Sequence, residues 1–83
     1  MNIYVGNLPY SMTSEQLREV FVPHGEIVRA VVITDRETGR SKGFGFVEMA
    51  DATAGQAAID ALDGQEVDGR PLRVNEARPR EDR

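Results

Sequence analysis

The sequence contains no cysteine and a single histidine. Without cysteine, neither a disulfide framework nor a thiolate zinc site can form, so a domain of this size must be stabilised by packing alone. The chain also lacks a long apolar stretch and a basic leader, which we interpret as the absence of a membrane span and of a signal peptide. We therefore expect a protein inside the cell, in the cytoplasm, with the nucleus as the alternative.

The length supports one domain, because 83 residues cannot build two hydrophobic cores. Hydrophobic residues make up 40% of the chain and cluster in strand-like runs, which argues against disorder. We expect one domain at residues 1–77, a short charged tail at 78–83, and a monomeric protein.

The net charge of -4 argues against nucleic-acid binding, since phosphate contacts usually draw on an excess of Lys and Arg. The charges are unevenly distributed, however. All charged side chains in residues 43–69 are acidic, whereas basic side chains gather at 36–42 and from residue 70 onward. This distribution predicts a polarised domain, acidic on one side and basic on another.

The residue pattern predicts four strands and two helices in the order βαββαβ. Alternation and β-branched residues predict strands at 2–6, 26–33, 43–49 and 70–77. A helix at 14–21 is indicated by Thr13 and Gln16, which have the spacing of a capping box, and a second at 51–64 by Asp51 and Gly64. Residues 34–42 are expected to form a mobile hairpin connection. Together these elements predict an α+β sandwich of two layers, with both helices on one side of the sheet.

The alternation within the strands indicates which face of the sheet is the core. Aliphatic residues share one face of the first and last predicted strands, and on the third strand Val47 and Met49 share that parity with two glycines. Phe44 and Phe46 then fall on the other face, together with Tyr4 of the first strand. The alternative is that the two phenylalanines are core residues. That arrangement would also draw Lys42 and Glu48 inward, and we predict instead that the three rings lie on the open face.

Two segments resemble the ribonucleoprotein motifs of the RNA recognition motif family. IYVGNL at 3–8 resembles the hexamer, and KGFGFVEM at 42–49 matches seven of the eight positions of the octamer. Met49 replaces the last aromatic of the octamer. Because Met49 has inward parity, this departure affects packing more than binding. The resemblance extends from Met1 to about Ala77.

This resemblance implies a ferredoxin-like fold with a four-stranded antiparallel sheet, in which the first and third strands are central and the three rings form a platform. Unpaired bases stack on such rings, and two or three nucleotides of single-stranded RNA would be held. Phosphate contacts are implied for Arg40 and Lys42. Arg73 and Asn75 would flank the bases with hydrogen-bond donors, and Arg78 would close over the last strand from the C-terminal side. The predicted site therefore consists of Asn2, Tyr4, Arg40, Lys42, Phe44, Phe46, Arg73, Asn75 and Arg78. For Asn2, base contact and simple solvent exposure both remain open.

The leading hypothesis is a single-stranded RNA-binding protein that acts in post-transcriptional regulation or as an RNA chaperone. The alternatives are a protein-interaction module with the same fold, or single-stranded DNA binding. A small enzyme ranks last, because the sequence contains no cluster of nucleophile, base and oxyanion donors. We accordingly expect no catalytic residue, no metal and no cofactor. His24 stands alone in a turn segment and has no second ligand near it in the sequence.

Overall fold

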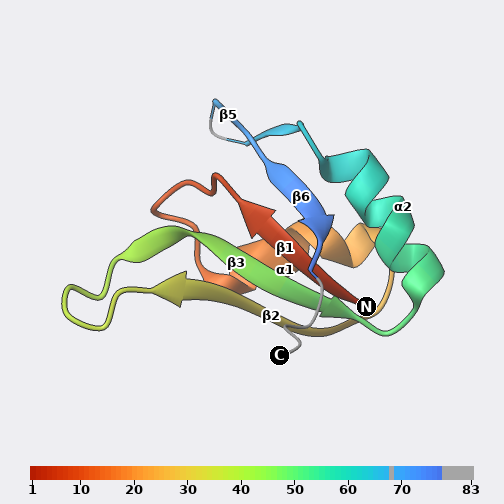
Figure 1. The fold of residues 1–83 in the computed structure, drawn as a ribbon, viewed down its shortest axis with the longest axis horizontal. Helices are drawn as coiled ribbons and strands as arrows, with labels where there is room; N and C mark the ends of the chain where they lie inside the picture. Colours follow the sequence, from red (N-terminus) through yellow and green to blue (C-terminus); the bar gives the residue numbers. More distant parts are fainter. Residues whose placement is uncertain (68, 78–83) are drawn as a thin grey trace, which may run out of the picture.

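A computed structural model describes residues 1–67 and 69–77, which form a layer of strands and a layer of helices (Figure 1). The elements are β1 (Asn2–Gly6), α1 (Ser14–Phe21), the 3-10 turn η1 (Val22–His24), β2 (Ile27–Thr34), β3 (Ser41–Met49), α2 (Ala52–Leu62), β4 (Glu66–Val67), β5 (Arg70–Pro71) and β6 (Arg73–Glu76). The predicted βαββαβ order is present, with the small β4–β5 hairpin added before the last strand.

The main sheet has the strand order β2-β3-β1-β6, and every neighbouring pair in it is antiparallel. The expected central position of the first and third strands is therefore confirmed. In the register, Tyr4 of β1 lies opposite Phe46 on one side and Asn75 on the other. The two motif segments are thus hydrogen-bonded to each other along their length.

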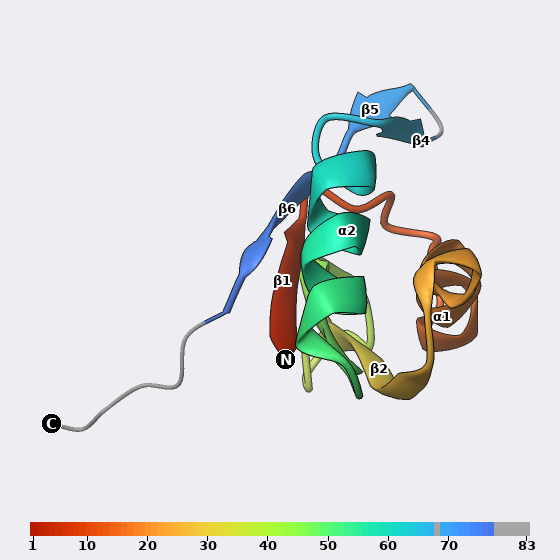
Figure 2. The ribbon, with the colours of Figure 1, turned by 90° about the vertical axis from the view of Figure 1, so that its right-hand side faces the viewer.

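Both helices pack on the same side of the sheet (Figure 2). The N-terminus of α1 has the predicted capping box: the Thr13 hydroxyl accepts from the Gln16 amide, and the Gln16 side chain accepts from the Thr13 amide, each at 3.1 Å. Asp51 caps α2 by accepting from the Thr53 amide at 3.0 Å. Across residues 1–67 and 69–77, no helix has the length and apolar character needed to cross a membrane.

The core lies between the sheet and the helices and contains the aliphatic side chains that parity predicted. Val47 is 1% exposed and Leu72 is 2% exposed. Gly45 of β3 lies directly beneath α1, since a Cβ at this position would lie 3.1 Å from Leu17 Cδ2 and would also meet the Val31 carbonyl oxygen. The glycine is therefore needed for the close approach of helix and sheet.

The last strand differs from the expectation. Residues 70–77 were predicted as one strand, but β5 pairs with β4 and only β6 joins the main sheet. The break occurs at Leu72, whose amide donates to the Gln65 carbonyl and whose carbonyl accepts from the Gly64 amide. Pro71 has no N–H to contribute to a ladder beside β1. The strand is divided because the backbone of Leu72 is hydrogen-bonded to Gly64 and Gln65, in the segment that follows α2.

Candidate nucleic-acid interface

Three aromatic rings lie together on the sheet face opposite the helices. The ring centroids of Tyr4 and Phe44 are 5.9 Å apart, those of Tyr4 and Phe46 5.8 Å, and those of Phe44 and Phe46 6.0 Å. Phe46 is 37% exposed, whereas its neighbour Val47 is buried. The interpretation of the phenylalanines as core residues is therefore wrong. We call these three rings the aromatic platform.

Cross-strand register places polar residues beside the aromatic platform. On β6, Asn75 lies opposite Tyr4, and Arg73 lies opposite Gly6, two residues further along the strand pair. Both side chains are exposed. Donors from the outer strand therefore border the platform on one side. On its other side Val31 of β2 lies opposite Phe46 and is 38% exposed, so it extends the apolar surface by one strand.

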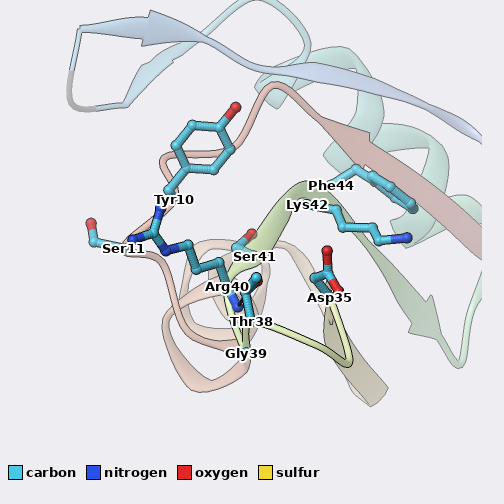
Figure 3. Close-up of a pocket in the computed structure, with 9 residues that line it drawn as sticks. All are labelled: Tyr10, Ser11, Asp35, Thr38, Gly39, Arg40, Ser41, Lys42 and Phe44. Atoms are coloured by element: carbon cyan, nitrogen blue, oxygen red, sulfur yellow. Dashed lines mark hydrogen bonds between the residues drawn. The ribbon is translucent and has the colours of Figure 1, made fainter.

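A groove of about 1030 Å³ opens at one end of the platform, between the segment after β1 and the β2–β3 connection. Lys42 extends beside Phe44, whereas Arg40 extends toward Tyr10 and Ser11 (Figure 3). The connection is closed by the Asp35 amide, which donates to the Arg40 carbonyl at 2.7 Å. The structure therefore brings Lys42 next to the platform and places Arg40 at the far wall of the groove.

Sequence reasoning missed Tyr10, which lines this groove, and Arg70, which contacts the Tyr10 ring. Tyr10 is 65% exposed, and the Arg70 guanidinium carbon lies 5.3 Å from the centre of its ring, within the range of a cation–π contact. Arg70 comes from the β4–β5 hairpin, which was not predicted. β4 and β5 have only two residues each, which is too short for an alternating hydrophobic pattern. The sequence therefore did not indicate this hairpin or the contact that Arg70 makes from it.

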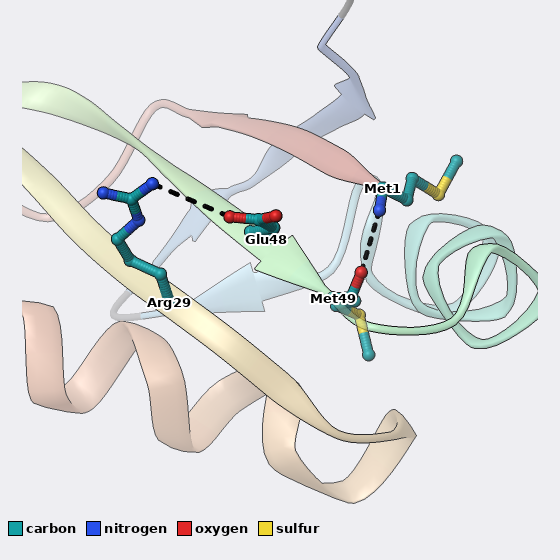
Figure 4. A network of polar contacts seen from close by, with 4 residues as sticks. All are labelled: Met1, Arg29, Glu48 and Met49. Atoms are coloured by element: carbon teal, nitrogen blue, oxygen red, sulfur yellow. Dashed lines mark hydrogen bonds and ion pairs between the residues drawn. The ribbon is translucent and has the colours of Figure 1, made fainter.

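The opposite end of the platform carries Asn2, Glu48 and Arg29 in one cross-strand row. Arg29 Nη2 lies 3.7 Å from Glu48 Oε1, and the two side chains point toward each other (Figure 4). Nearby, the amino group of Met1 donates to the Met49 carbonyl at 2.8 Å, which fastens the start of β1 to the end of β3. Asn2, the β1 member of this row, is exposed and lies at the opposite end of the platform from the basic groove.

Acidic and basic residues that lie in different stretches of the sequence also lie in different layers of the structure. The exposed basic residues Lys42 and Arg73 belong to the sheet, whereas Asp60 belongs to α2 in the other layer and Asp51 caps that helix. Glu48 of β3 departs from this separation, because it lies on the open face of the sheet next to the aromatic platform. Arg78, the last residue of the predicted site, lies outside the described residues.

Comparison with known proteins adds four findings. The model of the family described as "RNA recognition motif" matches residues 3–73. RbpE of Nostoc sp. is 58% identical over 83 residues, which cover 100% of this chain and 84% of that protein. The crystal structure of the RNA binding protein PG1 superposes with a TM-score of 0.92 at 52% identity, over 99% of each chain. The Rna15 domain, solved with bound RNA (GU), has a TM-score of 0.86 at 29% identity, over 96% of this chain and 85% of that one.

Proposed function

Since the chain belongs to the RNA recognition motif family, we propose that it binds single-stranded RNA on the open face of its sheet, through the aromatic platform. The observation that carries this proposal is the set of three mutually contacting rings on a face that the helices leave uncovered. The exposure of aromatic rings to water has a free-energy cost, which a flat partner that stacks on the rings removes. Every nucleobase offers such a partner.

Each part of the interface has a distinct task in this proposal. Tyr4, Phe44 and Phe46 stack on bases, at about 1–3 kcal/mol per base. Arg73 and Asn75, on the strand beside β1, offer hydrogen-bond donors to base edges. Lys42 and Arg40 contact phosphates where the strand of RNA leaves the platform along the groove. Stacking then supplies most of the affinity, and the protein does not need a positive net charge.

Several further features belong to the same proposal. The domain spans residues 1–77, which include the whole range matched by the family model. The protein acts as a monomer in the cytoplasm, in post-transcriptional regulation or as an RNA chaperone, and catalyses no reaction. The similarity to the Rna15 domain, which was solved with bound RNA, supports RNA as the ligand. Stacking alone does not distinguish RNA from single-stranded DNA, so the preference for RNA must come from contacts to the 2′-hydroxyl.

The test is a titration of fluorescent RNA octamers against the parent protein and the triple variant Tyr4→Ala, Phe44→Ala, Phe46→Ala. We expect the variant to lose measurable binding while circular dichroism shows a folded domain, because the three rings lie outside the core. Val22→Ala is the control, since it removes an exposed apolar side chain from the helical layer. A folded triple variant that binds like the parent would refute the platform and favour a protein-interaction module.

A further inference from the structure

An acidic residue lies on the proposed RNA-binding face, two positions after Phe46. Glu48 has the outward parity of the aromatic platform, and its side chain is 39% exposed. A carboxylate repels phosphates, so its presence beside a stacking ring does not serve general affinity for the backbone. A carboxylate does, however, accept hydrogen bonds from N–H groups on the edge of a base.

The surroundings of Glu48 form a small polar site around one aromatic ring. A hollow of about 120 Å³ is lined by Phe46, Val31 and the row of Asn2, Glu48 and Arg29. Residues i and i+2 of a strand are separated by about 7 Å, so the edge of a base stacked on Phe46 reaches toward Glu48. The site thus combines an apolar floor with hydrogen-bond acceptors and donors at its rim.

Arg29 supplies the complementary donor. Its guanidinium lies 3.7 Å from the Glu48 carboxylate, and its side chain is 74% exposed (Figure 4). A pair this long and this exposed adds little to stability, so the simple interpretation as a stabilising cross-strand ion pair explains little. The pairing does place an acceptor and a donor next to each other on the open face of the sheet.

From this arrangement we propose that Glu48 and Arg29 make the Phe46 position selective for guanine. Guanine has two adjacent donors on its Watson–Crick edge, N1–H and N2–H₂, with the acceptor O6 next to them. The two oxygens of Glu48 would accept from the donors, while Arg29 would donate to O6. Cytosine and adenine each offer one amino group beside a ring acceptor, and uracil places two carbonyls around its single donor. None of these three satisfies both carboxylate oxygens.

The inference rests on the proposed function, and one set of titrations tests the two separately. The probes are a labelled uridine octamer and octamers with a single central guanosine, adenosine or cytidine. We expect the guanosine octamer to bind about tenfold more tightly than the other three, within the range of one bidentate base contact. Glu48→Gln should reduce its affinity to that of the uridine octamer. The matched control is Glu19→Gln on α1, which changes the charge equally on the helical layer and should keep the preference.

Base analogues identify the edge that is read. Inosine lacks the N2 amino group and should lose part of the preference, whereas 7-deazaguanine keeps the Watson–Crick edge and should bind like guanine. Arg29→Met should weaken the guanosine octamer more than the uridine octamer. If the parent binds all four octamers equally, or prefers cytidine or adenosine, or if Glu48→Gln keeps the preference, the guanine site is wrong and RNA binding stands. If the parent binds none of them, the proposed function itself fails.

Discussion

The ring of Tyr4 lies over the Cα of Gly6, two residues further along the same strand. A Cβ at position 6 would lie 2.6 Å from the Tyr4 hydroxyl oxygen and 2.9 Å from Cε2. These contacts are closer than side-chain atoms can approach, so the glycine leaves the space in which the ring lies against the sheet. The orientation of the ring on the open face therefore depends on the absence of a side chain next to it.

Gly6→Val should displace the Tyr4 ring and weaken RNA binding by about 1–3 kcal/mol, the contribution of one stacked base. Fluorescence anisotropy with an RNA octamer measures the loss. The control is a double-mutant cycle: in a Tyr4→Ala background, Gly6→Val should cost little more, because the ring that it displaces is already gone. Fully additive losses would contradict this relationship.

Gly45→Ala should destabilise the domain by about 1–3 kcal/mol, because the new methyl group would meet the backbone of β2 and the Leu17 side chain. Urea unfolding followed by circular dichroism measures the change in the free energy of unfolding. Gly55→Ala is the matched comparison on α2. There the new methyl group meets the end of the Met1 side chain, which can move, and alanine favours the helix by about 1 kcal/mol over glycine. Equal losses in the two variants would contradict the close approach at Gly45.

Thr13→Ala should lower the free energy of unfolding by about 1 kcal/mol through the loss of the hydroxyl that accepts from the Gln16 amide. The measurement is again urea unfolding. Thr53→Ala serves as the control, since Thr53 lies in the first turn of α2, two residues after the capping residue Asp51, and its side chain is exposed. A Thr13 variant as stable as the Thr53 variant would show that the capping box contributes nothing measurable.

The salt dependence of RNA binding should be shallow. About three or four phosphate contacts give a slope of log K against log salt concentration of about -2 to -3 for single strands. Lys42→Gln should reduce the magnitude of this slope by about 0.7, whereas Phe46→Ala should lower the affinity at every salt concentration and leave the slope unchanged. A slope near -6 in the parent would mean that charge, rather than stacking, dominates the affinity.

The sequence predicted the elements whose residues carry a repeating pattern. Alternation along 2–6 and 43–49 identified the core face, and the Thr13 capping box located the first residue of α1. The division of the last strand at Leu72 escaped prediction, because it depends on hydrogen bonds to the chain after α2. The pairing of Arg29 with Glu48 required the register of β2 against β3, which includes irregular steps that sequence alone does not reveal. The Tyr10–Arg70 contact joins segments far apart in the chain.

The position of β1 in the sheet has a consequence for synthesis of the protein. β1 precedes both of its partners in the chain, and β6 completes the sheet only at its last described residues. During translation β3 can pair with one edge of β1 once residue 49 has emerged, whereas the other edge stays unpaired until β6 has left the ribosome. A chain terminated before residue 73 would keep one of these edges open and become a template for aggregation.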